Sequence, residues 1–477
     1  MRAAWLLLLL APGCARTPPL CRDEACVLAT LLVDAGSARR PDAGVASQVA
    51  YVKAQNTEAG DAFGEAVALS GDGETMAVGA PGEDSRVPTN PFDNRASASG
   101  AVSVFVRREE TWVAQAYLKS PAPRQGDHFG HRVALSSDGN TLAVSAIDES
   151  SDAVGVDQPE VNARAPSSGA VFIFARVGRA WTQAAYLKAS NAGAGDLFGA
   201  SLSLSADGAV LVVGAPGEGS DAAGVDADQL NDRAPGRGAL YLFRRGSAGW
   251  KQERYLKPRE ADVWAFGSAA ALSADATTLV VQSGADGGVI TALGLPGLEE
   301  QGSTRATTRF AAVATSGAGD HAASAQLTDT DGRVTVYLRG PPWRVGGALP
   351  SPRGPGFGSA LAFSSDGAVL VVGHPGDASR ATGAGGDEAD TSRPGSGAVR
   401  VYVRRGDGYA QLVYLKAFNT GARDAFGTSV ALSEDGGTLV VGAPGEASAA
   451  VGVGGNPFNE SAPNAGAVYT FSLSALP

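Results

Sequence analysis

Acidic and amide side chains gather in one stretch of the chain, residues 221–232, and their oxygen atoms are the first features that could do chemistry. The stretch holds Asp221, Asp226, Asp228, Asn231 and Asp232. Calcium takes six to eight oxygen ligands in proteins, several of them carboxylates. The residues therefore indicate a calcium- or ligand-binding loop. Solvated loops have the same composition, because Asp, Asn and Gly favour turns. Both interpretations stay open, and the sequence indicates no other cofactor.

Groupings of catalytic residues are scarce by contrast. The chain has four histidines, and two of them stand close together in His128-Phe-Gly-His131. This pair is a poor metal site, because the related segments described below carry unrelated residues at both positions. No nucleophile elbow, phosphate-binding loop, zinc spacing or dinucleotide fingerprint is convincing. We therefore expect no catalytic residues and a protein that is not an enzyme.

The segment from Met1 to Cys14 (1–14) is typical of an export signal. Arg2 precedes an apolar run from Trp5 to Ala11, which is too short to span a bilayer as a helix. The end of the segment, Ala11-Pro12-Gly13-Cys14, resembles the lipobox of bacterial lipoproteins, in which the cysteine is lipidated. Ala11 stands where that motif usually has leucine, so ordinary signal-peptidase cleavage near Ala15 is the alternative. We expect an outer-membrane or cell-surface lipoprotein, or otherwise a secreted or periplasmic protein.

The other two cysteines, Cys21 and Cys26, follow within a segment of residues 15–44 that is typical of a linker or tether. If Cys14 carries lipid, Cys21 and Cys26 form an even pair that an exported protein could oxidise to a disulfide. Two incidental thiols are the alternative. No cysteine lies beyond Cys26, so the rest of the fold does not depend on disulfides.

The charge of the chain argues against a nucleic-acid partner. The formal net charge is −11, and there are six lysines. Five lysines follow a Tyr-Leu or Tyr-Val pair at one repeated position: Lys53, Lys119, Lys188, Lys257 and Lys416. No basic stripe remains that could neutralise a phosphate backbone. We expect membrane contact only through an N-terminal lipid.

A repeated segment organises the chain from residue 45 to residue 477. Its clear copies resemble FGEAVALSGDGETMAVGAPGE and start at Phe63, Phe129, Phe198, Phe266, Phe357 and Phe426. They recur at nearly equal intervals, except for one markedly longer interval between Phe266 and Phe357. A degraded copy that starts near Phe310 divides this interval. The sequence therefore contains seven repeats, and repeats of this kind predict one large repeat domain.

Each repeat predicts four antiparallel strands. In the first repeat, apolar stretches at residues 66–70 and 75–80 flank an Asp-Gly turn, and stretches at residues 100–106 and 112–119 follow. Seven such sheets around an axis form an all-β, seven-bladed propeller. The last repeat lacks its fourth strand, and residues 45–54 match the pattern of that strand. We therefore expect the N-terminal strand to complete the last blade and close the ring.

The phrases Phe-Gly, Gly-Ala-Pro and Gly-Ala-Val resemble the FG-GAP repeat family, which includes the propeller head of integrin alpha subunits. The plain repeats here are most similar to its bacterial exported branch. The resemblance implies a propeller used for binding, often at cell surfaces, and does not name a ligand. Integrin-type repeats often hold calcium in the first hairpin through several aspartates, whereas the hairpins here keep one, which favours a simple turn.

Long loops between the second and third strands distinguish five of the repeats. They span residues 84–99, 150–168, 219–237, 378–396 and 447–465, and blades 4 and 5 lack them. The loops should form an arc on one face, beside the segments that link the blades. Two adjacent loops share Asn-Pro-Phe, at residues 90–92 and 456–458, which indicates a shared apolar contact.

We therefore predict a non-enzymatic exported surface protein. Its propeller is a scaffold for binding or adhesion to an extracellular or envelope protein or glycan through the loop face. Two alternatives stay open: a hydrolase-like propeller enzyme with its site in the central channel, and a purely structural envelope or matrix protein.

Overall fold

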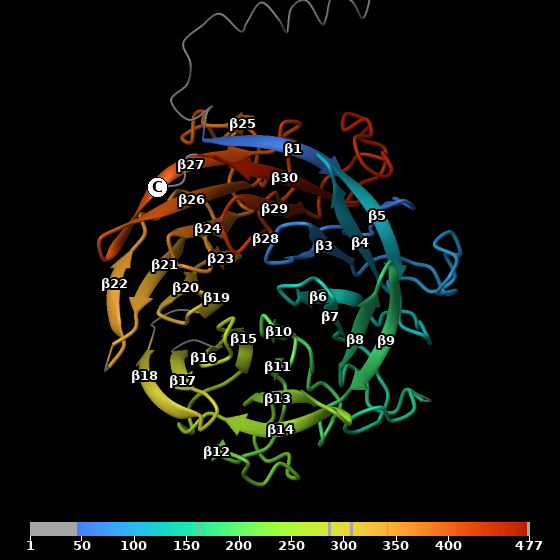
Figure 1. Cartoon of the computed structure of the whole chain (residues 1–477), viewed down its shortest axis with the longest axis vertical. Helices are drawn as coiled ribbons and strands as arrows, with labels where there is room; N and C mark the ends of the chain where they lie inside the picture. The colour runs from blue at the N-terminus through green and yellow to red at the C-terminus, as the bar shows by residue number, and fades with distance from the viewer. Residues whose placement is uncertain (1–44, 161, 285–287, 306–308, 341, 475–477) are drawn as a thin grey trace, which may run out of the picture. The chain divides into compact units, whose positions relative to one another are not determined.

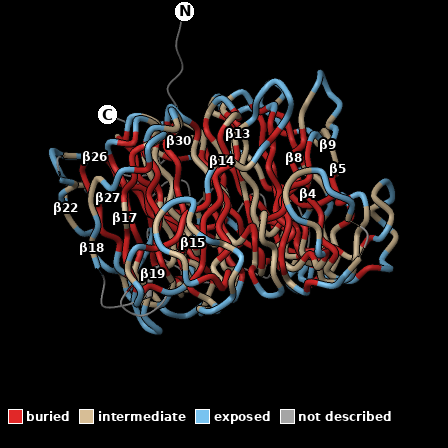
Figure 2. Tube along the Cα trace, turned by 90° about the horizontal axis from the view of Figure 1, so that it is seen from below, coloured by how far each residue is buried: buried red, intermediate tan, exposed pale blue. Residues whose placement is uncertain are grey.

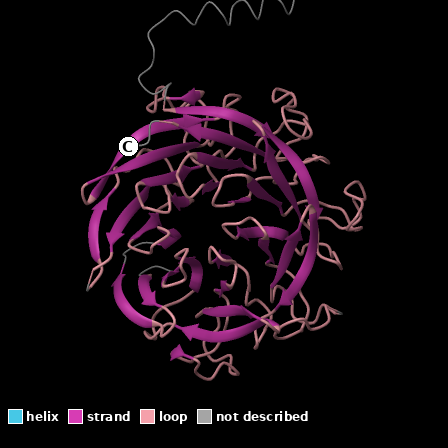
Figure 3. Cartoon of the chain, viewed as in Figure 1, coloured by secondary structure: helices cyan, strands magenta, loops and turns pink. Residues whose placement is uncertain are grey.

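Seven antiparallel β-sheets surround a central axis in the computed structural model (Figure 1). The structure describes residues 45–160, 162–284, 288–305, 309–340 and 342–474, so Cys14, Cys21 and Cys26 lie outside the described residues. Within these ranges the chain consists of strands and loops (Figure 3), and no helix there could cross a membrane. The prediction of a seven-bladed, all-β propeller is confirmed.

A serine and an aspartate fold the first hairpin of every blade. In blade 1 the Ser70 hydroxyl donates to Asp72 Oδ1 at 2.5 Å and accepts the Thr75 N–H at 2.9 Å. Gly73 follows with a φ of 73°, the left-handed conformation that glycine adopts at little cost. The aspartate of each repeat is thus used within its own turn. The seven pairs are Ser70–Asp72, Ser136–Asp138, Ser205–Asp207, Ser273–Asp275, Ser316–Asp320, Ser364–Asp366 and Ser433–Asp435.

The strands of each blade pair with their neighbours in chain order. Blade 1 contains β2 (Ala66–Leu69), β3 (Thr75–Ala80), β4 (Ala101–Arg108) and β5 (Thr111–Leu118). Blade 2 contains β6 (Phe129–Leu135), β7 (Thr141–Ala146), β8 (Ala170–Val177) and β9 (Ala180–Leu187). Blade 3 contains β10 (Ser201–Leu204), β11 (Val210–Ala215), β13 (Ala239–Gly246) and β14 (Gly249–Lys257).

The remaining blades follow the same plan. Blade 4 contains β15 (Phe266–Leu272), β16 (Thr278–Ser283), β17 (Val289–Gly294) and β18 (Glu299–Arg305). Blade 5 contains β19 (Arg309–Thr315), β20 (His321–Leu327), β21 (Gly332–Leu338) and β22 (Arg344–Ala348). Blade 6 contains β23 (Leu361–Phe363), β24 (Val369–His374), β26 (Ala398–Arg405) and β27 (Gly408–Lys416). Blade 7 contains β28 (Ser429–Leu432), β29 (Thr438–Ala443), β30 (Ala467–Leu473) and β1 (Ala46–Val52).

Strand β1 lies at the outer edge of blade 7, against β30. The two strands are antiparallel, with Tyr51 opposite Tyr469 and Val52 opposite Val468. Blades 3 and 6 each have a fifth, two-residue strand that the sequence did not predict: β12 (Gly224–Val225) beside β14, and β25 (Gly383–Ala384) beside β27. Both come from long loops that fold outward and cover part of an exposed sheet edge.

The core lies between neighbouring blades. The second strands β3, β7, β11, β16 and β24 are buried along their whole length, because each is covered on both faces. In Figure 2, buried residues (red) run through the body of the propeller, and exposed residues (pale blue) gather in the loops at its two rims. The blades approach most closely where the glycine of Gly-Ala-Pro meets the Phe-Gly glycine of the next blade. A Cβ added to Gly79 would lie 2.0 Å from the Gly130 carbonyl oxygen. The same approach joins Gly214 to Gly267, Gly373 to Gly427, and Gly442 to Gly64.

A second set of contacts between blades surrounds the axis at the first hairpins. The backbone N–H of the residue after the hairpin serine donates to the carbonyl of the equivalent residue in the next blade, at 2.8 to 3.0 Å. Six such bonds join the described residues: Gly71 to Ser137, Ser137 to Ala206, Ala206 to Ala274, Gly317 to Ser365, Ser365 to Glu434, and Glu434 to Gly71. The step from Ala274 to Gly317, between blades 4 and 5, is not among them.

Candidate binding surface

The five long loops are fixed to the propeller by buried polar groups, and blade 2 illustrates the arrangement. Lys188, at the end of β9, donates to Glu149 Oε2 and to Ser168 Oγ, both at 2.7 Å. Glu149 begins the long loop and Ser168 ends it. The side chains of Lys188 and Glu149 are fully buried, so the ion pair is shielded from solvent. We call this group of a lysine, an acidic residue and their partners an anchor cluster.

An anchor cluster lies in each blade that carries a long loop. The ion pairs are Lys119–Glu83, Lys188–Glu149, Lys257–Glu218, Lys416–Asp377 and Lys53–Glu446, in blades 1, 2, 3, 6 and 7. Burial lowers the pKa of every one of these lysines, and the acidic partner counteracts the shift. A buried charge is stable only when paired, so each ion pair fixes the start of its loop. In blades 1, 2 and 6 the lysine also donates to the serine that ends the loop.

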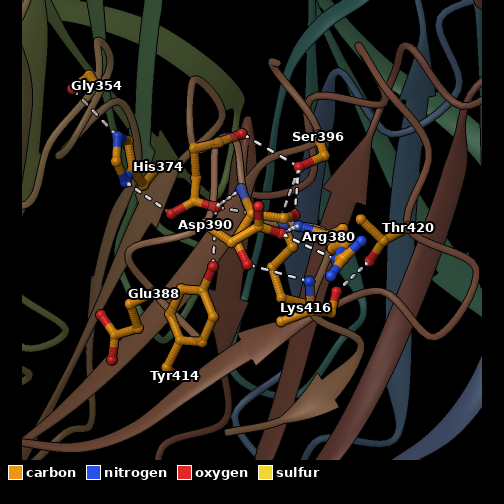
Figure 4. Close-up of polar contacts among 12 residues, drawn as sticks. Gly354, His374, Arg380, Glu388, Asp390, Ser396, Tyr414, Lys416 and Thr420 are labelled. Atoms are coloured by element: carbon orange, nitrogen blue, oxygen red, sulfur yellow. Dashed lines mark hydrogen bonds and ion pairs between the residues drawn. The ribbon is translucent and has the colours of Figure 1, made fainter. Parts of the chain in front are cut away.

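Blade 6 shows how the cluster tolerates change (Figure 4). Asp377 stands where the other blades have glutamate, and it accepts from Tyr414 at 2.8 Å and Lys416 at 3.2 Å. Arg400 is only 2% exposed and lies beside this cluster, with its Nη1 atom 2.9 Å from His374 Nδ1. Burial and the Arg400 charge lower the pKa of His374 to about 4, so the ring is neutral at pH 7.

An asparagine in the segment before a blade connects the anchor cluster to the tip of that blade's loop. Asn191 Nδ2 donates to Glu218 Oε1 and to the Gln229 carbonyl, both at 2.9 Å. Asn56 makes the same two bonds to Glu83 and Pro91. In blade 7, Asn419 bonds Glu446 and Pro457. In all three blades the carbonyl that precedes the loop tip is therefore held by a buried polar network.

The residue after this carbonyl is a large apolar side chain that faces solvent. Phe92 is 68% exposed, Leu230 is 82% exposed and Phe458 is 69% exposed. We call these three residues the loop tips of blades 1, 3 and 7. The matching residue of blade 2, Val161, lies outside the described residues. The expected contact between Phe92 and Phe458 is not formed, and Phe458 instead packs edge-on against Phe418 at 6.2 Å.

The acidic residues that the sequence singled out shape the loop of blade 3. Asn231 Oδ1 accepts the N–H groups of Asp221 and Arg233. Asp226 accepts the Tyr255 N–H at 3.0 Å, and Asp228 accepts the Leu230 N–H at 3.0 Å. The side chain of Asp232 lies against Gly219. Within the described ranges, no three His, Cys, Asp or Glu residues are grouped in a way that could hold a metal ion.

A second group of acidic residues, which the sequence analysis did not single out, lies beneath the loops. The four residues are Asp61, Asp127, Asp196 and Asp424, each in a segment that links two blades. Burial raises their pKa values to about 7, and a backbone N–H donated to each carboxylate counteracts part of the shift. In blade 3, Asp196 Oδ2 accepts the Gly193 N–H at 2.7 Å. These carboxyl groups change charge near neutral pH.

Few ionisable residues line the described part of the central channel at the end where the first hairpins lie. A cavity of about 180 Å³ opens there, and leucines from five blades line it with Phe363: Leu69, Leu135, Leu204, Leu272 and Leu432. Glu434 is the one ionisable residue in this part of its lining. A general acid and base would need at least two such groups within reach of a substrate.

Sequence reasoning found the loops and missed the anchor clusters. The lysines were visible as a repeated residue, and the acidic residue ends the Gly-Ala-Pro-Gly-Glu segment of blades 1, 3 and 7 and its variants in blades 2 and 6. Five lysines and five acids occur together in the five repeats that have long loops. This joint occurrence is the signal that could have predicted an ion pair, because an unpaired charge is rarely buried.

Comparison with known families agrees with this architecture. A family model described as FG-GAP repeat matches residues 46–105, 181–243 and 409–471. Each matched stretch begins in the fourth strand of one blade and ends in the third strand of the next. The three stretches therefore contain the long loops of blades 1, 3 and 7, which carry the three loop tips. No curated protein matches the chain.

Proposed function

Because the chain is an FG-GAP repeat protein with a seven-bladed propeller, we propose that it is a non-enzymatic scaffold that binds a protein or glycan through its long loops. The observation that carries the proposal is the equivalent position of the three loop tips. Single exposed apolar side chains are common, whereas apolar residues gathered on one face of a protein mark interaction sites. Here the feature recurs in three blades at one structural position.

The rigidity of the loops supports binding. Each tip follows a carbonyl that an asparagine holds, and that asparagine contacts the anchor cluster. A loop that is fixed before binding loses less conformational entropy when a complex forms. Aromatic residues such as Phe92 and Phe458 also supply large contact areas for a protein surface or the face of a sugar ring.

Export and surface attachment are part of the same proposal. The apolar run from Trp5 to Ala11 and the cysteine at Cys14 support an exported lipoprotein, and loops that bind an envelope or extracellular partner require such a location. Mass spectrometry of the protein from membranes of its source cells tests this part. A lipid-modified Cys14 supports it, and an unmodified mature chain that starts near Ala15 contradicts lipidation.

The binding test compares the intact chain with a variant of the three tips, Phe92→Ser, Leu230→Ser and Phe458→Ser. Both proteins are immobilised and exposed to envelope extracts and to a glycan array. We expect a specific partner that binds the wild type and is lost with the variant. Equal capture by both proteins would contradict the proposal.

A matched control uses Val177→Ser. Val177 is 78% exposed and is the last residue of β8, next to the turn into β9, at the opposite end of the blade from the long loop. This variant removes an exposed apolar side chain without changing the loop face, so it should keep the partner. A hydrolase panel gives the test against the enzyme alternative: turnover that a substitution of Glu434 abolishes would contradict a non-enzymatic role.

A further inference from the structure

Consecutive long loops are joined to each other through the segment that links their blades, and we call such a connection a junction. In the junction between blades 2 and 3, the Gly195 N–H donates to the Pro166 carbonyl, near the end of the blade 2 loop, at 2.8 Å. The next residue, Asp196, accepts the Gly217 N–H on its backbone carbonyl at 3.1 Å. Gly217 lies just before the blade 3 loop, and its own carbonyl accepts the Gly236 N–H near the end of that loop at 3.1 Å. Two adjacent residues of the link therefore connect both loops.

The same junction recurs between the other neighbouring pairs of long loops. Bonds to the end of the preceding loop, at 2.9 to 3.0 Å, join the N–H groups of Gly60, Gly126 and Arg423 to the carbonyls of Pro463, Ser97 and Pro394. Bonds to the start of the next loop, at 3.1 to 3.4 Å, join the N–H groups of Gly82, Asp148 and Gly445 to the carbonyls of Asp61, Asp127 and Asp424. Four junctions thus connect the loops of blades 6, 7, 1, 2 and 3 in order.

A buried aspartate lies in each of these junctions. The four junction aspartates are Asp61, Asp127, Asp196 and Asp424, and each is at most 5% exposed. The link into blade 4 does not join two long loops, and its aspartate, Asp262, is exposed. The link into blade 6, residues 349–356, contains no aspartate. Among the links that the structure describes in full, a buried aspartate therefore occurs only where two long loops meet.

The surroundings of Asp196 disfavour its negative charge. Its Oδ2 atom accepts the Gly193 N–H at 2.7 Å, which stabilises the charge in part. Burial raises the pKa of this carboxyl to about 7, and the nearby carboxylates of Glu218 and Asp232 contribute to the shift. An ionised Asp196 would therefore lie beside two other negative groups.

The remaining ionisable groups that face Asp196 do not offer a free positive charge. Lys188 and Lys257 both favour its ionised form, but each is already paired with a glutamate of an anchor cluster. Tyr241 and Tyr255 also lie nearby, and burial raises the pKa of both phenols, so they stay neutral. The charge of Asp196 is thus uncompensated in the closed junction.

The other junction aspartates have similar neighbours, and the acidic residue of the next blade's anchor cluster is among them in every junction. The groups are Glu58, Glu83, Asp84, Lys53, Lys119 and Tyr117 around Asp61; Arg124, Asp148, Glu149 and Glu160 around Asp127; and Glu446, Glu460, Lys416, Tyr51 and Tyr469 around Asp424. The lysines among these groups belong to anchor clusters. Arg124 is the one further cation among them.

We propose that the four junction aspartates form a pH-sensitive switch that loosens the loop face when they lose their protons. A buried carboxylate without a free cation becomes stable only when water reaches it. Water reaches Asp196 when the link moves away from Pro166 and Gly217, and this movement separates the loops of blades 2 and 3. The inference rests on the function proposed for the loop face, because it concerns how that face is held ready for a partner.

The direction of the switch follows from the protons that each state binds. The closed junction keeps its proton up to a pH of about 7, whereas an opened, hydrated aspartate releases it near its ordinary value of about 3.9. Raising the pH from about 4 to about 7 therefore favours the open state, and the effect is complete above this window. The loops are fixed most firmly in acid and are looser at neutral pH.

Hydrogen–deuterium exchange of the full chain, followed by mass spectrometry, tests the switch without any partner. The rates are corrected for the intrinsic dependence of amide exchange on pH. Amides of the blade 3 loop (219–237) and the blade 7 loop (447–465) should then open about tenfold more often at pH 7 than at pH 5. Amides of the core strands β11 and β29 should show no such change.

Asp196→Asn is the matched variant, because the amide resembles the protonated acid and its oxygen can still accept the Gly193 N–H. The blade 3 loop of this variant should keep its acid-state protection at pH 7. The blade 7 loop, which Asp424 joins to the blade 6 loop, should still open as in the wild type. Asp262→Asn changes an exposed aspartate of a link without a junction and should leave both loops as in the wild type.

Three results would overturn the switch. The first is corrected loop exchange in the wild type that is the same at pH 5 and pH 7. The second is a parallel change in β11 and β29, which would indicate opening of the whole fold. The third is an unchanged pH dependence of the blade 3 loop in Asp196→Asn. Failure of the binding proposal gives a different result: no partner is lost with the three tip substitutions, while the exchange measurements still report the switch.

Discussion

Blades 2 and 3 and blades 4 and 5 are built from the same repeat, but they differ in their loops, their buried ion pairs and their contacts with neighbouring blades. Blades 2 and 3 each combine a long loop with a buried lysine–glutamate pair, and their contacts with neighbouring blades follow the glycine pattern or a close variant of it. Blades 4 and 5 have no long loop and no anchor cluster among their described residues, and Gln282 separates them. The long loop, the buried ion pair and the close approach of neighbouring backbones are therefore absent together from the described residues of this part of the ring. Within the described residues, the buried lysine pairs therefore occur where long loops have to be held.

The largest expected effect comes from breaking an anchor cluster. Lys188→Met leaves Glu149 as a buried, unpaired charge, and removal of one partner of a buried pair costs about 3–5 kcal/mol. Urea denaturation followed by circular dichroism measures the loss. A change below about 1 kcal/mol would show that the ion pair does not stabilise the fold.

An exposed pair in blade 4 gives the control for this prediction. Arg305 Nη1 and Asp262 Oδ2 lie 2.9 Å apart, but both side chains face solvent. Solvent and salt screen such a pair, so Arg305→Met should leave stability unchanged within error. The double variant Lys188→Met/Glu149→Leu should recover most of the loss, since no buried charge remains.

A smaller effect is expected where the blades approach each other. In Gly214→Ala, the new Cβ would lie 2.0 Å from the Gly267 carbonyl oxygen, so the two blades must shift apart. Overpacking of this kind costs about 1–3 kcal/mol. Gln282→Ala, at the same position of blade 4, should cause no comparable loss. Equal destabilisation by both changes would contradict the view that Gln282 widens the contact between blades 4 and 5.

The repeated parts of the molecule were the parts that the sequence could predict. Seven blades, the strand order and the turns at Ser70–Asp72 and its equivalents follow from local patterns that recur at nearly equal intervals along the chain. The strands β12 and β25 were missed, because two residues carry too little pattern to be recognised. Their pairing depends on where the loop meets an exposed edge, which is a property of the folded blade.

The candidate site was only partly predictable for a related reason. The sequence identified the long loops and their acidic residues, but Asp226 and Asp228 bond their own loop and the neighbouring strand. The lysines were first interpreted only through net charge. Their burial beside Glu83, Glu149 and Glu218 depends on contacts between residues 36 to 39 positions apart. Such contacts require the register of the blade.

The buried aspartates between blades give a prediction with a defined pH window. Asp196 has a pKa of about 7 in the folded chain, against about 3.9 in an unfolded chain. The folded state therefore holds a proton that the unfolded state releases, and the contribution of Asp196 to stability falls as pH rises from about 4 to 7. Asp196→Asn removes this dependence. Relative to the wild type, the variant should be more stable at pH 8 and equally stable at pH 4, because the neutral amide avoids a buried charge.

Thermal melting of wild type and Asp196→Asn at several pH values measures this difference. Asp262→Asn is the control, because Asp262 is exposed in blade 4 and should show no such gain on the alkaline side. A difference in melting temperature between wild type and Asp196→Asn that stays constant from pH 4 to 8 would show that Asp196 does not titrate in this range.

The smallest expected effect on stability is at the loop tips, and it separates binding from folding. Phe92, Leu230 and Phe458 are mostly exposed, so their replacement by serine should change the free energy of unfolding by less than about 0.5 kcal/mol each. The anchor clusters stay intact in this variant and continue to hold the loops. A loss of partner binding at unchanged stability would assign binding to the tips themselves. A large loss of stability would instead place the tips in the structural framework of the loops and remove the observation on which the binding proposal depends.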